Sequence, residues 1–323
     1  MQTAAYVGMK ARGVQGALLS YVGFGLPAFA LMMLLSSLYA AYHAVPGVAS
    51  LFSGLQVLVC AIVANAAWFF GRTTLKNSAD LVFAVAAALL FWAGASPFLI
   101  IVGAALARIL IPGSAGNIPS AEIQGDPDRH YVKHLAMLLL VLAAVLLTLS
   151  LIDKKLFDLA ALMMRIDLFA FGGGFASVPL MLHEVVDVRR WMDSKTFMDD
   201  IVLGQITPGP IVITSTFVGY LTHRIAGAFV ATAAIFTPSL LLVITLTPVM
   251  DKLKSSAFFH RAIKGILASF VGLLLFVTLK FSSAVPWDIV RVLLGLGVLI
   301  ALIKKVDLLY VVLATAALSV FIF

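Results

Sequence analysis

The chain has 323 residues, of which 62% are hydrophobic and only 11% are charged, and its mean hydropathy is +1.10. Because a soluble domain carries about 25% charged residues, this composition excludes an ordinary water-soluble domain and indicates that lipid is the solvent for most of the chain. The net charge of +7 comes from basic residues between apolar runs, as in membrane topology signals, and no basic stripe with interleaved aromatic residues indicates nucleic-acid binding.

The sequence offers few groups that could perform catalysis or hold a cofactor. Cys60 is the only cysteine, which excludes a disulfide framework and a thiolate metal cluster. His183 and Glu184 begin like a zinc-peptidase motif, but Asp187 stands where that motif needs its second histidine. Since no phosphate-binding loop, dinucleotide fingerprint or nucleophile elbow is present either, we expect no enzymatic activity and no cofactor.

Apolar spans follow one another along the whole chain. Lipid does not tolerate unpaired backbone groups, so each span should be a helix, complete or broken, and the fold class should be an all-α polytopic membrane protein. The spans lie near 14–42, 47–70, 79–95, 97–112, 133–152, 156–185, 197–220, 225–249, 262–283, 287–303 and 306–323. Two pairs of short spans, on either side of Ser96-Pro97 and of Lys304-Lys305, predict tight helical hairpins.

A polar segment divides the chain into related parts. Residues 113–130 are rich in Gly, Pro and Asp and predict a linker between residues 1–112 and 131–323. When the sequence is shifted by 211 positions, glycines and a proline match in register without a gap: Gly8, Gly16, Pro27 and Gly54 fall on Gly219, Gly227, Pro238 and Gly265. We therefore predict two homologous transmembrane repeats, an arrangement in which transporters place the substrate site at the repeat interface.

The same register predicts that the first repeat is incomplete. Met1 aligns with Val212, so the counterpart of 131–211 is missing from the first repeat. We expect either a start codon assigned too far downstream or a truncated gene product.

Two interruptions in the second repeat are the strongest candidates for a binding site. Gly172, Gly173 and Gly174 break one apolar span, either as a half-helix terminus whose free N–H groups face an anion or as a close helix contact. Pro208-Gly209-Pro210 breaks the next span, and Gln205 and Thr207 precede it. Because two prolines remove two donors, we interpret this break as lining a cavity, with a simple kink as the alternative.

Charged residues near these breaks have both functional and structural interpretations. Arg165 and Asp167 lie inside an apolar span and, two positions apart, should not face each other on a helix. Arg165 is either a functional intramembrane charge or a side chain that reaches the interface. Glu184, Asp187 and the residues after them predict a surface loop, and Asp199 with Asp200 predicts the favourable acids of a helix N-terminus.

The residues around both breaks resemble a known family. FGGGFASVPLMLHEVV at 171–186, RRWM at 189–192 and FMDDIVLGQITPGPIVITSTFVGYL at 197–221 are similar to the chromate ion transporter family, which has two homologous halves with a Phe-Gly-Gly and a Pro-Gly-Pro segment each. The resemblance implicates the matching motif residues of this chain, which are Phe171 to Gly174, Pro179, Glu184, Trp191, Gln205, Pro208, Gly209, Pro210 and Gly219.

The resemblance implies export of chromate through a bacterial inner membrane. A chromate dianion needs converging N–H and hydroxyl donors and a positive charge, which the glycine segment, Thr207 and Arg165 could supply. A sulfate or other oxyanion carrier and a non-transporting half that scaffolds a partner remain as alternatives. The expected partners are the oxyanion, the lipid bilayer and, as one alternative, a second copy of the chain.

Overall fold

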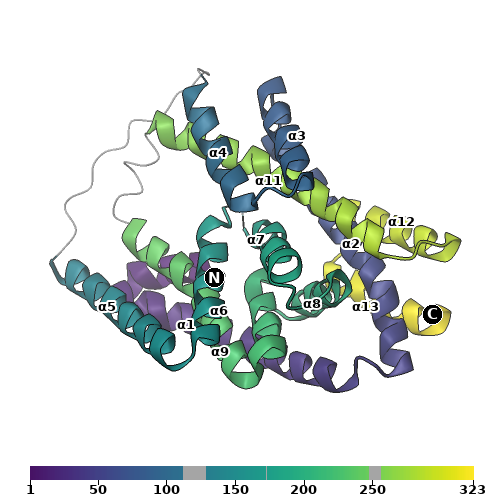
Figure 1. Cartoon of the computed structure of the whole chain (residues 1–323), viewed down its shortest axis with the longest axis horizontal. Coiled ribbons are helices and arrows are strands. Elements are labelled where there is room, and N and C mark those ends of the chain that lie inside the picture. Colours follow the sequence, from purple (N-terminus) through teal and green to yellow (C-terminus); the bar gives the residue numbers. More distant parts are fainter. Residues whose placement is uncertain (112–128, 172, 247–255) are drawn as a thin grey trace.

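The computed structural model describes residues 1–111, 129–171, 173–246 and 256–323, and every regular element in these ranges is a helix (Figure 1). Four helical stretches among them are long and apolar enough to cross a membrane: Gln2–Tyr42 (α1), Pro46–Thr74 (α2), Ile211–Leu246 (the short helix η2, Ile211–Ile213, followed by α9, Thr214–Leu246) and Ala257–Ala284 (α11). The predicted all-α polytopic membrane fold is therefore confirmed.

The two predicted hairpins are present and use short helices. The first pairs α3 (Ser78–Trp92) with α4 (Pro97–Leu110), and the second pairs α12 (Ile289–Ile303) with α13 (Leu308–Ile322). Pro97 begins α4, a position where its missing N–H has no helical partner to lose. Helices of this length reach only about 22 Å, less than the ~30 Å of a bilayer core, so each hairpin is suited to packing against a longer helix.

A shared backbone distortion relates the two repeats. Arg12 and Gly13 interrupt α1 at φ/ψ of −142/29° and 62/−148°, and His223 and Arg224 interrupt α9 at −138/29° and 52/−142°. The two kinks are 211 positions apart, the offset that the sequence comparison gave. The second kink therefore occupies the same place in its repeat as the first.

The matched glycines explain how each kink is packed. A Cβ on Gly8 would lie 2.3 Å from the carbonyl oxygen of Gly16, and a Cβ on Gly219 would lie 2.2 Å from that of Gly227. The backbone before each kink thus folds against the backbone after it, at a separation that only glycine permits.

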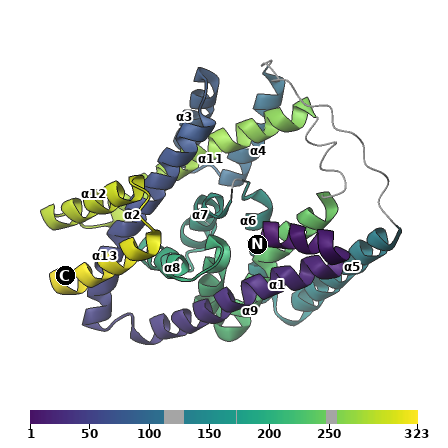
Figure 2. The ribbon, with the colours of Figure 1, turned by 180° about the vertical axis from the view of Figure 1, so that it is seen from behind.

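One long helix of each repeat packs against the hairpin of the other repeat. Helix α2 packs against α12 and α13, whereas α11 packs against α3 and α4 (Figure 2). Equivalent glycines make the closest approaches, with Gly54 against Ser319 and Gly265 against Ala104 and Arg108. Because Arg108 and Ser319 are themselves 211 positions apart, the exchange of hairpins follows the same pseudo-two-fold relation.

The repeats run in opposite directions. Aromatic pairs along the α1–α9 contact join Tyr21 to Phe236 at 5.9 Å, Phe29 to Phe229 at 4.8 Å and Tyr39 to Phe217 at 5.0 Å between ring centroids, so the two helices are antiparallel. A two-fold axis that makes equivalent helices antiparallel is perpendicular to both. For helices that cross a bilayer, such an axis lies in the membrane plane, which is the inverted-repeat arrangement of many transporters.

The segment before α9 runs from α5 at the periphery to the middle of the molecule (Figure 1). It comprises α5 (Arg129–Ile152), α6 (Lys154–Phe169), α7 (Gly174–Met181), the π-helix η1 (Leu182–Val188) and α8 (Ser194–Ile206). Helices α7 and α8 lie centrally, between α6 and α9 on one side and α2 and α11 on the other (Figure 1). Of the predicted linker, only Arg129 and His130 fall within the described residues, and they begin α5.

Candidate functional site

The glycine and proline interruptions meet in space. Helix α6 ends at Phe169 and α7 begins at Gly174, so the predicted break is real, although Gly172 lies outside the described residues. A Cβ on Gly174 would lie 2.9 Å from Cβ of Ile211, the residue that follows the Pro-Gly-Pro segment. The close helix contact predicted as one alternative is therefore present at Gly174.

Gly173 contributes conformation rather than close packing. It precedes α7 with φ +99°, a backbone conformation that favours glycine, and a Cβ there would meet nothing within 4 Å. Because α7 begins directly after it, the first N–H groups of α7 lack partners within their own helix. The half-helix terminus that the sequence suggested is thus compatible with the close contact next to it.

The proline interruption separates α8 from α9 and faces the other repeat. Thr207 ends α8, is buried, and donates from Oγ1 to the carbonyl oxygen of Leu203 at 2.9 Å. Pro208 and Gly209 are exposed, and a Cβ on Gly209 would lie 2.7 Å from Cβ of Ala28 in α1. The break is therefore an open loop at the contact between the repeats.

Two buried donors near this loop have no hydrogen-bond partner among the described residues. They are Nε2 of Gln205, in the last turn of α8, and the hydroxyl of Ser215, in the first turn of α9. Buried polar atoms are normally satisfied, so unsatisfied donors call for an explanation. An oxyanion held beside the Pro-Gly-Pro loop would accept hydrogen bonds from such groups.

Arg165, the predicted charge of the site, is engaged with η1 and α4. It forms an ion pair with Glu184, and its guanidinium lies 4.3 Å from the ring centroid of Phe98 in α4. Its side chain is 46% exposed, and these contacts do not bring it to Thr207 or the Pro-Gly-Pro loop. The structure therefore shows a partly accessible arginine whose charge is shared with a carboxylate.

The prediction that Glu184 lies in a surface loop is wrong. Glu184 and Asp187 belong to the π-helix η1, and Glu184 is buried. Its carboxylate pairs with both Arg165 and Arg189, while Arg189 also donates to Asp158 at 3.1 and 3.2 Å. A buried carboxylate requires such compensation, which the sequence could not reveal because the arginines come from two different elements.

Asp167 has a structural partner on α9. Its two oxygens accept from the backbone N–H of Ser239 at 2.6 Å and from the Ser239 hydroxyl at 2.8 Å. Ser239 directly follows Pro238, where the helical bonding pattern of α9 is disturbed. Asp167 and Arg165 thus point to different partners, as their spacing predicted.

Asp199 and Asp200 are the residues whose position sequence reasoning misjudged most. Helix α8 begins at Ser194 with Asp193 as its cap, so both residues lie inside the helix and not at its N-terminus. Asp199 accepts hydrogen bonds from Tyr39 at 2.8 Å and from Gln56 at 2.9 Å. Asp200 is fully buried, and neither of its oxygens has a partner in the part of the chain that the structure describes. The signal that could have found them was two adjacent acids inside an apolar span.

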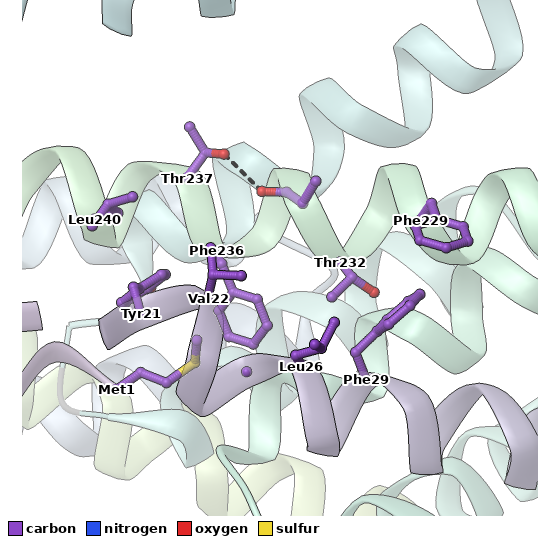
Figure 3. Close-up of a pocket in the computed structure, with 12 residues that line it drawn as sticks. Met1, Tyr21, Val22, Leu26, Phe29, Phe229, Thr232, Phe236, Thr237 and Leu240 are labelled. Carbon is purple, nitrogen blue, oxygen red and sulfur yellow. Dashed lines mark hydrogen bonds between the residues drawn. The ribbon is translucent and has the colours of Figure 1, made fainter. Parts of the chain in front are cut away.

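An apolar groove at the contact between the repeats is a poor site for a dianion. It has a volume of about 360 Å³ and lies between α1 and α9 (Figure 3). Its lining includes repeat-equivalent pairs such as Tyr21 with Thr232 and Leu26 with Thr237, so it straddles the pseudo-two-fold axis. Both threonine hydroxyls are already bonded within α9, to Ala228 and Ala233, which leaves a surface suited to hydrocarbon.

Among the described residues no group of three or more His, Cys, Asp or Glu could hold a metal ion.

Comparison with known proteins identifies the family. The family model described as "Chromate transporter" matches residues 1–109 and 157–320. The chain belongs to the chromate transporter family. It is a multi-pass membrane transport protein and not an enzyme, and the two matched segments coincide with the two structural repeats.

Individual relatives span most of the chain. An "Uncharacterized transporter MJ0718" of Methanocaldococcus jannaschii is 40% identical over 322 residues, which cover 99% of this chain and 80% of the relative. The "Probable chromate transport protein" of Synechococcus elongatus is 27% identical over 310 residues, with 93% and 75% covered. The "Chromate transport protein" of Cupriavidus metallidurans is 28% identical over 311 residues, with 94% and 74% covered. No solved structure matches.

Proposed function

We propose that this chain exports chromate, or a tetrahedral oxyanion of the same charge, through a prokaryotic cytoplasmic membrane. The observation that supports the proposal most is the contact between Gly174 and Ile211, because it joins the two helix interruptions within a chromate transporter family member. Discontinuous helices that meet in this way present free backbone groups to a substrate in other transporters. The division of the chain at 113–130 into a shorter and a longer repeat is part of the same proposal.

The binding site that we propose combines backbone donors, side-chain donors and one positive charge. The glycine segment 172–174 and the N-terminus of α7 would supply N–H groups, and the loop 208–210 would leave room for the anion. Gln205 would supply an unpartnered side-chain donor, and Thr207 would exchange its bond to the Leu203 carbonyl for one to the anion. Arg165 would supply the charge by exchanging part of its ion pair with Glu184 for the substrate. In this view Glu184 holds the arginine in place until an anion arrives.

Export agrees with the electrical gradient. Moving negative charge out of a cell with an inside-negative potential is favourable by about 2.3 kcal/mol per charge per 100 mV. A dianion therefore gains twice that amount on leaving, and the protein has only to lower the barrier.

The test is chromate flux in proteoliposomes, normalised to inserted protein. Gly174→Ala should reduce flux by roughly tenfold or more, because its methyl group would push the two interruptions apart at their point of contact. Gly297→Ala is the matched control, since a Cβ on Gly297 in α12 would meet nothing within 4 Å, and it should transport at the parent rate. Parent-rate flux from Gly174→Ala would place the site elsewhere.

Sulfate competition distinguishes the nearest alternative. Chromate and sulfate share shape and charge, and hydrogen-bond donors alone discriminate little between them. Added sulfate that suppresses chromate flux at equal concentration would identify a general oxyanion carrier.

A further inference from the structure

The acidic pair in α8 is not explained by the proposed anion site. Asp200 is fully buried and neither carboxylate oxygen has a hydrogen-bond partner among the described residues. Burying a charged carboxylate without compensation is far more costly than burying the neutral acid. Asp200 in this arrangement is therefore stable as a carboxylic acid, which means that it holds a proton.

The neighbouring carboxylate has the opposite environment. Asp199 is buried as well, but it accepts from the hydroxyl of Tyr39 at 2.8 Å and from Nε2 of Gln56 at 2.9 Å. When one of two adjacent acids has hydrogen-bond donors and the other has none, the pair is most stable with one proton. That singly charged state costs less free energy than the state with both acids ionised or the state with both neutral. The donors of Asp199 come from α1 and α2, so the first repeat holds a carboxylate of the second.

Two side chains that can exchange protons lie between the exposed end of α1 and this pair. His43 is exposed, its ring stacks on Tyr39 at 5.2 Å between centroids, and the Tyr39 hydroxyl donates a hydrogen bond to Asp199. Histidine and tyrosine can both accept and donate protons. Tyr39 thus contacts the pair directly, and His43 places a titratable group next to it at the exposed end of α1.

The pair is also close to the proposed anion site. Asp200 lies one helical turn, about 6 Å along the axis, before Gly204 and on the same face of α8. A Cβ on Gly204 would lie 2.8 Å from Cγ2 of Thr214, at the start of α9. A dianion beside the Pro-Gly-Pro loop would therefore repel a negative charge on Asp200 across a short, poorly screened distance.

Few other charges act on the pair. Asp193 and His43 act on Asp199, and Asp199 acts on Asp200. Of the packed elements, η1 contributes Glu184, which pairs with Arg165 and Arg189, and Asp187, which pairs with Lys280 of α11. Helix α13 has no charged residue, α2 faces the pair with Gln56, and the first turn of α9 brings only hydroxyls.

We propose that the Asp199–Asp200 pair is the proton site of the transport cycle, and that a proton bound there is carried together with the oxyanion. The inference rests on the proposed function. The proton enters from the aqueous phase on the side where the anion binds and leaves on the side where it is released. With one proton for each dianion, one net negative charge still crosses, so the inside-negative potential continues to favour export.

The test separates exchange from net transport. The full chain is reconstituted with radiolabelled chromate, and the membrane potential is clamped. Exchange is measured with equal chromate and equal pH on both sides, and net flux is measured with an imposed pH gradient. We expect the pH gradient to drive net flux in the parent, and Asp200→Asn to lose that response while exchange stays within about threefold of the parent.

Asp307→Asn is the matched control. Asp307 caps α13 in the exposed hairpin, and asparagine caps helices equally well, so both measurements should equal the parent values. An Asp200→Asn protein that still responds to the pH gradient would overturn the inference. Parent protein that exchanges chromate but ignores the pH gradient, or follows a sodium gradient instead, would overturn it while leaving the proposed function standing.

If the Asp200→Asn protein is inactive, a second measurement tests the inference. Chromate binding to the parent protein is measured in detergent over a series of pH values at which chromate itself remains the dianion. Affinity that falls as the pH rises, with a weaker pH dependence in the folded Asp199→Asn variant, supports the proton site, and a pH-independent affinity in the parent overturns it. Parent protein that neither exchanges nor binds chromate would contradict the proposed function itself.

Discussion

The two helical hairpins occupy equivalent places in the repeats but are held by different forces. In the first hairpin Asp80 and Arg108 form an ion pair at 3.4 Å, with side chains only 6% and 8% exposed. The equivalent positions of the second hairpin hold Arg291 and Ser319, and Arg291 pairs with Asp288 and lies 4.2 Å from the ring centroid of Phe323. The same backbone frame therefore carries a buried ion pair in one repeat and a more exposed one in the other.

The difference shows what the repeat preserves. Glycines at the helix contacts and the kink positions recur at one offset, and the charges do not. The close contacts between helix backbones are therefore shared by the two pseudosymmetric repeats, whereas each charged contact occurs in one repeat only.

Removing one partner of the buried pair should have the largest effect. Arg108→Ala leaves Asp80 buried without its counter-ion, which should cost about 3–5 kcal/mol of stability and lower the apparent melting temperature in detergent strongly. Arg291→Ala should lower it less, because the side chain of its partner Asp288 is 46% exposed. Equal losses from the two variants would show that the hairpins are equivalent after all.

The paired glycines at the kinks should give the next largest effect, and an equal one in both repeats. Gly8→Ala and Gly219→Ala would each place a methyl group against a backbone carbonyl oxygen, at 2.3 Å and 2.2 Å. Such overpacking typically costs about 1–3 kcal/mol, and backbone cannot move aside as a side chain can. The check is the apparent melting temperature of both variants against Gly23→Ala, a position where a Cβ would meet nothing within 4 Å.

The frame could be predicted from sequence more fully than the site. Apolar spans gave the helices, Ser96-Pro97 gave a hairpin turn, and three glycines with a proline gave the repeat offset, because all of these are local or periodic signals. The partners of Glu184 and the exchange of hairpins depend on contacts between distant elements. Asp199 and Asp200 were misplaced because the start of α8 depends on the cap Asp193, four residues before the predicted span at 197–220.

The site residues themselves were found as separate candidates. Sequence reasoning named both interruptions as candidates for the binding site, and the structure brings Gly174 to Ile211. It could not assign the close approach to Gly174 rather than Gly173, since that depends on φ at one residue. Arg165 was named as the charge of the site, but its ion pair with Glu184 follows from the π-helix η1, which carries no sequence signal of its own.

The smallest expected effect concerns the kink itself, where Arg224 of the second repeat stands in the place of Gly13 of the first. Gly13 and Arg224 have nearly the same backbone conformation, at φ 62° and 52°, a region that is essentially reserved for glycine. Arg224 is exposed and the strain at such a position is typically about 1–3 kcal/mol, so Arg224→Gly should raise the apparent melting temperature slightly once the entropy of the new glycine is subtracted. Gly13→Ala should lower it by a comparable amount, although its Cβ meets nothing within 4 Å, because the cost lies in the backbone and not in packing. Opposite shifts from these two variants would establish that the kink is imposed by the tight glycine contact beside it, and a loss of stability in Arg224→Gly would show instead that the arginine side chain holds the second kink in place.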